Sequence, residues 1–481
     1  MGWLVGGRVV QSASTRVRLS VVLAVVAAIC AALVPATAGA RGRSGKPDLE
    51  VTWIKGYEAP GTPEDLNRVG VIKVGPEKAE NVLVLVPGTS AGSGYFVPLA
   101  NDVVENTDDW QVWSVERREN QLEDHSVLDK AKRRGKVTSQ EVFDYYLGYI
   151  TDPSIDPHSE PVDDATVGYA RDWGMNVAIE DLRRVVEAAR KLGGDVVMGG
   201  HSLGGTIVTA YATWDFDGTA GVEDLSGLVY IDGGSNPAPV SPEEATLALE
   251  GLAGGSPWLS FGGIPAPLAG VFAALGGTAT IVDPDSPSIA QNWSAFPANL
   301  KAPVQVTNKA QFGYALDVET SPMSLRAAQV NGGRLAESGD PRGWVRAGEI
   351  TPLRRWAAML SGIDVNGADG GAWYHPMRLT IDSRAVAAGN ANPAQDVLDV
   401  HAIHGDAIDV PIYAFGGALG GQRVLDAATA LAAQSGLAES RLTLINREAT
   451  YTHNDPSAAA PDNEFVDNLV PFLENVGKKG E

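Results

Sequence analysis

The chain has 481 residues, of which 44% are hydrophobic, and a formal net charge of −22. Its length exceeds the usual range for a single domain, so we expect one enlarged domain or a core with an inserted domain. Residues 1–40 contribute +3, which leaves −25 for the rest of the chain. Such an acidic chain excludes nucleic acids and anionic membrane surfaces as expected partners.

The N-terminus has the pattern of a signal peptide. Three arginines accompany an apolar run over 19–33, and small residues suited to cleavage end at Ala38 or Ala40. We expect residues 1–40 to be removed and the mature protein to be secreted, without a stable membrane anchor; an uncleaved signal anchor is the alternative. Cleavage would remove Cys30, the one cysteine, so the mature protein would contain no disulfide bond.

Short apolar runs bounded by turn residues predict the strands of one sheet. The run over 81–86 is typical of a strand buried on both faces, as a parallel sheet requires. Strands alternate with helical patterns, which predicts a mostly parallel, doubly wound α/β sheet. The predicted strands span 50–56, 69–74, 81–86, 111–115, the residues just before Gly200, 225–232, 410–417 and 441–446. The predicted helices span 139–149, 177–189, 206–212, 424–434 and 463–475.

The composition changes between residues 236 and 400, where Gly, Pro, Ala and Trp dominate and strands are hard to identify. Helical pieces are predicted near 242–252, 322–330 and 352–360. Aromatic side chains in this block either line an apolar pocket or form its own core, and the core is the more frequent arrangement. They are Trp258, Phe261, Phe272, Trp293, Phe296, Phe312, Tyr314, Trp344, Trp356, Trp373 and Tyr374.

One motif suggests catalysis: Gly200-x-Ser202-x-Gly204, which follows an apolar strand and precedes a helix-compatible run. Glycine on both sides relieves the crowding at the tip of a tight turn, so the serine hydroxyl projects into a cleft. The same pattern surrounds Ser90, but the Gly-Ser-Gly at 92–94 begins a helix poorly. We expect Ser202 to be the nucleophile, with Ser90 or a purely structural turn as alternatives.

The sequence Gly-His-Ser-Leu-Gly-Gly at 200–205 resembles the nucleophile elbow of the α/β-hydrolase superfamily, and the resemblance covers most of the chain. It implies an α/β-hydrolase fold with a large, mainly helical lid inserted after the sixth strand. We therefore predict four segments: a signal peptide at 1–40, the first part of the core at 41–235, the lid insertion at 236–400, and the second part of the core at 401–481.

A serine hydroxyl needs a base within hydrogen-bond reach, and the superfamily order along the chain is serine, acid, histidine. His453 lies between the last predicted strand and the closing helix, where the resemblance implies the base. Two other histidines are weaker candidates. His201 is in the elbow itself and is expected to point away from the serine, and His375 falls in the lid insertion.

The resemblance also implies an acid that orients the histidine. Most members carry it after the seventh strand, but here that turn, 416–421, contains no acid. A minority carry it after the sixth strand, where Asp232 ends a predicted strand. We therefore expect Asp232 to be the acid, with Asp406 and Asp426 as alternatives.

The resemblance implies that the oxyanion hole is built from backbone N–H groups. One belongs to Leu203, and the other belongs to Thr89 or Ser90 in the loop after the third strand. The family often has His-Gly in that loop, whereas this chain has Pro87-Gly88. An ordinary strand-to-helix turn is the alternative interpretation.

Serine at the elbow points to acyl transfer, whereas epoxide hydrolases and dehalogenases of this fold use aspartate there. We expect a secreted serine hydrolase that cleaves a carboxylic ester or lactone with an apolar or aromatic acyl part. A peptidase is one alternative, with Glu116 and the acids of residues 119–124 binding an amine. An acyltransferase and a non-enzymatic binding module are the others.

We expect no cofactor, because a serine-histidine-acid triad needs none. His401 and His404, near Asp406, have a spacing that could bind a metal, but two histidines without a third ligand are more often surface residues. No metal-ligand spacing stands out in the charged stretch from 116 to 165, which includes His125. The expected partner is a small-molecule or lipid-like ester.

Overall fold

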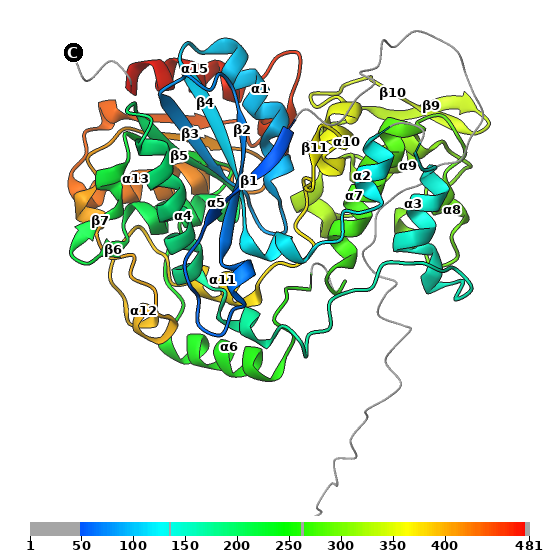
Figure 1. Cartoon of the computed structure of the whole chain (residues 1–481). Coiled ribbons are helices and arrows are strands. Elements are labelled where there is room, and N and C mark those ends of the chain that lie inside the picture. Colours follow the sequence, from blue (N-terminus) through cyan, green and yellow to red (C-terminus); the bar gives the residue numbers. More distant parts are fainter. Residues whose placement is uncertain (1–48, 134–135, 261–263, 477–481) are drawn as a thin grey trace, which may run out of the picture.

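A computed structural model describes residues 49–133, 136–260 and 264–476 (Figure 1). The predicted signal peptide and Phe261 lie outside the described residues. A nine-stranded sheet has the order β11-β1-β2-β4-β3-β5-β8-β12-β13. Its strands are β1 (Leu49–Lys55), β2 (Arg68–Val74), β3 (Asn81–Val86), β4 (Trp110–Glu116), β5 (Val196–His201), β8 (Gly227–Ile231), β11 (Val365–Asn366), β12 (Ile412–Gly416) and β13 (Leu442–Asn446).

The sheet is mostly parallel. Strand β2 runs antiparallel to its neighbours β1 and β4, and the other pairs are parallel. The predicted fold class is therefore confirmed, and the eight predicted strands agree with the observed ones to within a few residues.

Helices cover both faces of the sheet. In β3, Leu83 and Leu85 pack into the core beneath α1 and α15, while Val82, Val84 and Val86 face the opposite core, beneath α4, α5 and α13. Apolar residues at successive positions thus serve two different layers. The helices are α1 (Val97–Asn106), α4 (Met175–Arg190), α5 (Leu203–Ala212), α13 (Gln422–Ser435) and α15 (Glu464–Val476). A short hairpin, β6 (Asp215–Phe216) and β7 (Thr219–Ala220), follows α5.

Residues 236–400, which we call the lid insertion, are mainly helical but contain strands that the sequence analysis did not predict. Strand β11 joins the central sheet beside β1, and β9 pairs with β10 in a hairpin. The elements are α6 (Pro242–Gly254), α7 (Leu268–Val282), α8 (Ile289–Asn292), α9 (Asn308–Leu316), β9 (Arg334–Gly339), β10 (Arg342–Val345), α10 (Leu353–Ser361), α11 (Met377–Ser383) and α12 (Pro393–Leu398). Near the predicted helix at 322–330 the chain forms only a 3₁₀ helix, Met323–Ala328.

The lid insertion lies in two places. Helices α7 to α10 and the β9–β10 hairpin form a body beside the sheet (Figure 1). Helix α11 packs on α4 and α5, and α6 packs on α11 and α12. Two short helices from the charged stretch, α2 (Leu128–Lys132) and α3 (Ser139–Tyr146), pack on α7 and so belong to the same body.

Helix α7 had no counterpart among the predicted helices. Its sequence, LAGVFAALGGTATIV, is apolar on nearly every side because the helix is buried, so it lacks the polar stripe that marks an amphipathic helix. Two adjacent glycines also lower its intrinsic helix propensity. One of them has a packing reason: a Cβ at Gly277 would lie 2.4 Å from the carbonyl oxygen of Ala357 in α10.

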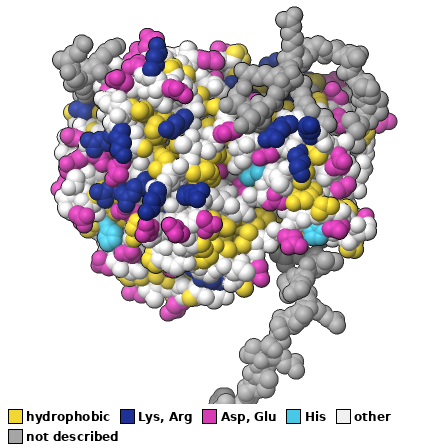
Figure 2. Space-filling model, in the orientation of Figure 1, with side chains coloured by type: hydrophobic (Ala, Val, Ile, Leu, Met, Phe, Trp, Pro, Cys, Tyr) yellow, Lys and Arg dark blue, Asp and Glu magenta, His cyan; other side chains and the backbone are white. Residues whose placement is uncertain are grey.

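Among the described residues, no helix is both long and apolar enough to cross a membrane. On the face shown in Figure 2, neither the acidic nor the basic side chains cover a continuous area.

The close contact between α7 and α10 predicts opposite effects for two glycine substitutions. Gly277→Ala should destabilise the protein by about 2 kcal/mol or more, because the new methyl group overlaps the backbone of α10. Gly251→Ala is the matched control: Gly251 is an exposed position in α6 with nothing within 4 Å of its Cβ, so alanine should stabilise by up to about 1 kcal/mol. Urea unfolding of both variants checks this, and equal midpoints would contradict it.

Candidate active site

Ser202 lies at the turn between β5 and α5, with φ 57° and ψ −123°. This left-handed conformation is costly for a residue with a side chain and persists only where the surroundings impose it. The two glycines of the motif allow it. A Cβ at Gly200 would lie 2.2 Å from the Gly204 carbonyl oxygen, and one at Gly204 would lie 2.1 Å from the Val86 oxygen. The predicted strand–turn–helix is present, and with the strand order it gives an α/β-hydrolase fold.

Ser90 also has positive φ, 51°, and lies in the loop after β3. It is followed by a 3₁₀ turn, Ser93–Phe96, rather than directly by an α-helix. Its backbone N–H donates to Nδ1 of His375 at 3.3 Å. Ser90 therefore lacks the strand–turn–helix setting that surrounds Ser202.

His453 and Asp232 are brought together as the sequence analysis expected. His453 Nδ1 lies 2.7 Å from Asp232 Oδ2, and both side chains are buried. Because Nδ1–H donates to the carboxylate, the lone pair of the neutral ring is on Nε2, the nitrogen that a general base would use. His453 and Ser202 line the same cavity. Among the described residues, Ser202 Oγ forms no hydrogen bond, which is common for catalytic pairs in the absence of substrate.

The glycine-rich turn after β12 supplies the environment of Asp232. Oδ1 of Asp232 accepts N–H bonds from Gly417 at 2.7 Å, Gly420 at 2.9 Å and Gly421 at 3.1 Å. A Cβ at Gly420 would lie 2.6 Å from that oxygen, so a side chain there would displace the carboxylate. The turn at 416–421, which contains no acid of its own, thus donates hydrogen bonds to the acid at the end of the neighbouring strand β8.

These contacts keep Asp232 ionised. Burial alone would raise the pKa of Asp232, but the hydrogen bond and charge of His453, together with the N–H of Gly421, outweigh burial and lower the pKa below its ordinary value. The alternative acids lie elsewhere. Asp406 is exposed in a 3₁₀ turn, and Asp426 accepts from the side chain of Gln422 within α13.

The ring of His201, which we expected to point away from the serine, packs 4.2 Å from the ring of His453. Its Nε2 lies 2.9 Å from the carbonyl oxygen of His453, and its ring stacks on Tyr95. Burial and the neighbouring His453 lower the pKa of His201 to about 3, so the ring stays neutral. Nε2–H therefore donates to the His453 backbone and fixes the loop that carries the base. No local pattern could have predicted this contact, because it joins residues 252 positions apart.

The loop after β3 lies directly on the elbow. A Cβ at Gly88 would be 2.9 Å from Cβ of Ser202. Of the two N–H groups considered for this loop, that of Ser90 is occupied by His375. Within the described parts of the chain, the N–H groups of Thr89 and Leu203 have no protein acceptor. The geometry favours Thr89 and Leu203 as the oxyanion donors.

Arg117, a residue that the sequence analysis did not single out, anchors this loop. Its buried guanidinium donates to the carbonyl oxygens of Pro87 at 3.0 Å and of Gly88 and Ala91 at 3.3 Å, and pairs with Glu119 at 2.6 Å. A planar group with five donors can serve several carbonyls at once. One feature of the sequence could have indicated this role: Arg117 directly follows a buried strand, at the carboxyl end, where ligands bind in parallel sheets.

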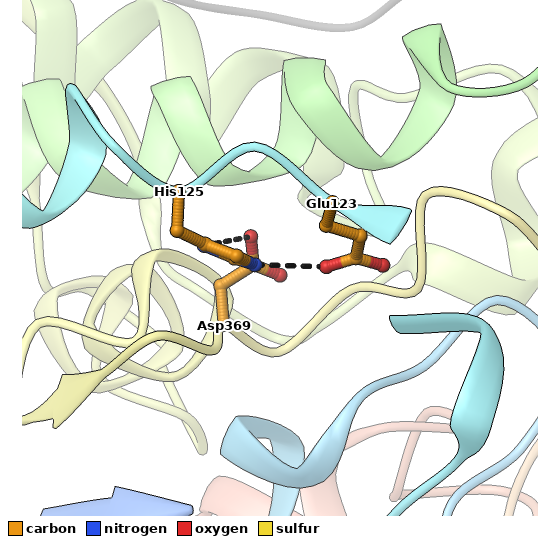
Figure 3. A group of neighbouring side chains, drawn as sticks. All are labelled: Glu123, His125 and Asp369. Atoms are coloured by element: carbon orange, nitrogen blue, oxygen red, sulfur yellow. Dashed lines mark hydrogen bonds and ion pairs between the residues drawn. The ribbon is translucent and has the colours of Figure 1, made fainter. Parts of the chain in front are cut away.

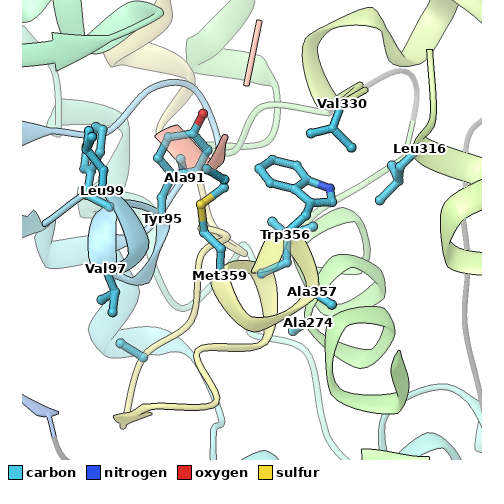
Figure 4. Packing of buried hydrophobic residues seen from close by; sticks show 14 of the residues in the cluster. Ala91, Tyr95, Val97, Leu99, Ala274, Leu316, Val330, Trp356, Ala357 and Met359 are labelled. Carbon is cyan, nitrogen blue, oxygen red and sulfur yellow. The ribbon is translucent and has the colours of Figure 1, made fainter. Parts of the chain in front are cut away.

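A cavity of about 520 Å³ opens above Ser202 and is walled by both the core and the lid insertion. Three of the aromatic residues noted in the sequence line it, namely Phe272, Phe312 and Trp356. Trp356 lies between Tyr95 of the core and the apolar side chains of Leu316 and Val330 (Figure 4). Among the described residues that line the cavity, none is an aspartate or a glutamate.

The acids considered for binding an amine are placed below the loop instead. Glu116 is buried and accepts the N–H of Ser93 at 2.5 Å, and Glu119 pairs with Arg117. The histidines considered for a metal pair separately with acids: His401 with Asp399 at 3.0 Å and His404 with Asp215 at 3.1 Å. Each of these side chains therefore has a partner within the protein.

Comparison with protein-family models and with curated proteins gives no match. Solved structures give distant similarities. A putative lipase from Sulfolobus solfataricus is 14% identical with a TM-score of 0.44, over 90% of this chain and 94% of that chain. An epoxide hydrolase from an endophytic Streptomyces is 14% identical with a TM-score of 0.40, over 89% and 96%. An esterase from Thermogutta terrifontis is 12% identical with a TM-score of 0.37, over 89% and 99%. The role of each side chain therefore has to come from the geometry of the site.

The buried Glu116 predicts a pH-dependent stability. Burial raises the pKa of Glu116 from 4.5 to about 6. The folded protein therefore holds this proton where the unfolded chain has lost it, so the stabilisation is complete below pH 4.5 and is lost as the pH rises to about 6. Relative to Glu116→Gln, the wild type should lose about 2 kcal/mol of unfolding free energy across this window. Urea unfolding at several pH values tests this, and parallel curves for the two proteins would refute it.

Proposed function

We propose that this protein, an α/β-hydrolase fold with serine at its elbow, is a secreted serine hydrolase that cleaves a carboxylic ester or lactone. The observation that carries the proposal is the convergence of Ser202 and the Asp232–His453 pair on one apolar cavity. Such a pair can activate a serine hydroxyl that comes within hydrogen-bond reach of the imidazole. The N-terminal signal pattern supports secretion, and the acidic composition suits a soluble protein.

In the proposed mechanism, Oγ of Ser202 attacks the carbonyl carbon while Nε2 of His453 takes the hydroxyl proton. The ionised Asp232 stabilises the resulting imidazolium, and the N–H groups of Thr89 and Leu203 bind the oxyanion. His453 then protonates the leaving alkoxide as the carbon–oxygen bond breaks. Water then attacks the acyl-enzyme and loses its proton to His453. His453 returns this proton to Oγ of Ser202 as the bond between Oγ and the acyl carbon breaks, and the carboxylic acid leaves.

The cavity wall supports an apolar or aromatic acyl group. Phe272, Phe312 and Trp356 provide flat apolar surfaces beside Ser202, together with aliphatic side chains from the lid insertion. An aminopeptidase would need a carboxylate to bind the substrate amine. The carboxylates of Glu116 and Glu119 already have partners beneath the loop, so ester substrates are favoured.

Labelling with a fluorophosphonate probe tests the nucleophile. The wild type should be labelled and Ser202→Ala should not, because the probe bonds to an activated serine oxygen. His453→Ala should lower the rate of ester hydrolysis by about 10⁴-fold or more. Ser90→Ala is the matched control, a serine on the same cavity that should keep its labelling. Undiminished labelling of Ser202→Ala would exclude the assignment.

Substrate preference follows from the cavity. For nitrophenyl esters of increasing acyl length, kcat/KM should rise by up to about 4-fold per methylene until the cavity is filled, since each buried methylene contributes about 0.8 kcal/mol. Amino-acid nitroanilides, which carry a free amine, should be poor substrates. A preference for those anilides over every ester would favour the peptidase alternative instead.

A further inference from the structure

Glu123, His125 and Asp369 form a compact group outside the proposed catalytic site (Figure 3). One ligand atom from each residue can be chosen so that all three atoms lie within 4.8 Å of one another. Glu123 and His125 follow the 3₁₀ helix Arg118–Leu122, whereas Asp369 belongs to the lid insertion, shortly after β11. The group therefore joins two parts of the chain that are far apart in sequence.

The two carboxylates are held in place by other hydrogen bonds. Oε1 of Glu123 accepts the backbone N–H of Trp373 at 2.7 Å. Oδ1 of Asp369 accepts the N–H of Gly371 at 2.6 Å, and Oδ2 accepts the indole N–H of Trp373 at 3.0 Å. Metal-binding carboxylates are usually oriented in this way by surrounding donors.

The imidazole between them is incompletely satisfied. Nε2 of His125 lies 2.9 Å from Oε2 of Glu123. Nδ1 has no hydrogen-bond partner even though the residue is buried, with only 7% of its surface exposed. The nearest acidic oxygen to Nδ1 is Oδ2 of Asp369 at 3.9 Å, which is too long for a hydrogen bond. Buried polar atoms without partners are rare, and this one faces a carboxylate.

Among the described residues, neither carboxylate of the group forms an ion pair with a lysine or an arginine. Both carboxylate side chains are 0% exposed. The buried ammonium of Lys132, the nearest basic group of α2, donates to the carbonyl oxygens of Val365 and Ala368 and to Asp129. Two desolvated carboxylates are costly unless a positive charge lies between them.

We propose that Glu123, His125 and Asp369 bind one divalent transition-metal ion, of which Zn²⁺ is the best match. Zinc accepts one imidazole nitrogen and carboxylate oxygens at about 2.0–2.2 Å, whereas calcium and magnesium prefer oxygen ligands alone. In a tetrahedral site such ligand atoms lie about 3.3–3.6 Å apart. One ligand atom from each residue already lies within 4.8 Å of the other two, so the side chains would have to close by at most about 1.2 Å to reach this spacing.

The ion would fasten the lid insertion to the segment after the 3₁₀ helix Arg118–Leu122, and so would hold the lid segment that is bonded to the loop after β3. The segment that follows Asp369 runs along this loop: Gly94 N–H donates to Asp369 O at 3.0 Å, Gly92 N–H to Gly370 O at 3.1 Å, and Ala372 N–H to Ser90 O at 3.0 Å. None of the three ligand residues lines the cavity described above. The ion would act on structure rather than on the bond being cleaved.

Zinc stoichiometry of the untagged protein is the direct test. Protein incubated with zinc chloride and dialysed should retain about one zinc per chain by elemental mass spectrometry, and calcium chloride in a parallel sample should leave none. Glu123→Gln and His125→Ala should each retain less than a tenth of the wild-type zinc. His401→Ala is the matched control, an exposed histidine paired with Asp399, and should retain the full amount. The same measurement in Ser202→Ala separates zinc binding from the proposed catalysis.

Thermal unfolding gives a second readout, which can be taken on the wild type alone should a variant fail to fold. Chelation should lower the unfolding midpoint of the wild type by several degrees, and added zinc should restore it. The Glu123→Gln midpoint should respond to neither treatment. Wild-type protein that retains no zinc and whose midpoint is insensitive to zinc and chelator would overturn the proposal. The group would then be a buried carboxylate–imidazole pair that shares a proton.

Discussion

Backbone crowding around Ser202 is the constraint on which the rest of the site depends. The end of β5, the loop after β3 and the end of β8 approach so closely that a Cβ at Gly205 would lie 2.4 Å from Gly233 O, and one at Gly233 would lie 2.0 Å from Ser202 O. Side chains at these glycines would force the three segments apart. Their absence lets the loop that contains Thr89 and the turn at the end of β8 that contains Asp232 both approach the elbow of Ser202.

Buried polar groups then hold the loops in place. Asp232 is solvated by N–H groups of the next turn, His201 donates to the backbone of His453, and Arg117 donates to the loop after β3. Asp232 and Arg117 each have several hydrogen-bond partners, which compensate for the burial of their charges and fix their positions. Glu116 and Glu119 also belong to this framework, through the N–H of Ser93 and the guanidinium of Arg117.

The sequence predicted the sheet well because buried parallel strands appear as apolar runs, and the elbow because its glycines are a steric necessity. Strand β11 and the β9–β10 hairpin were not predicted, since the former has two residues and the latter is largely polar and exposed. Helix α7 lacked an amphipathic pattern. The choice of Asp232 came from the missing acid in the turn at 416–421, whereas the partners of Arg117 and His125 come from distant segments that no local pattern connects.

The pairing of β11 with β1 bears on how such a protein could be re-engineered. Lids inserted into a sheet protein are often treated as modules to be deleted or exchanged between scaffolds. Here residues 236–400 supply the outermost strand of the sheet and the segment bonded to Gly92 and Gly94. Excision would expose β1 as a bare edge able to recruit other chains. The junctions of a chimaera of this protein should therefore lie within the segment from α7 to α10, so that residues 364–376 stay with the core.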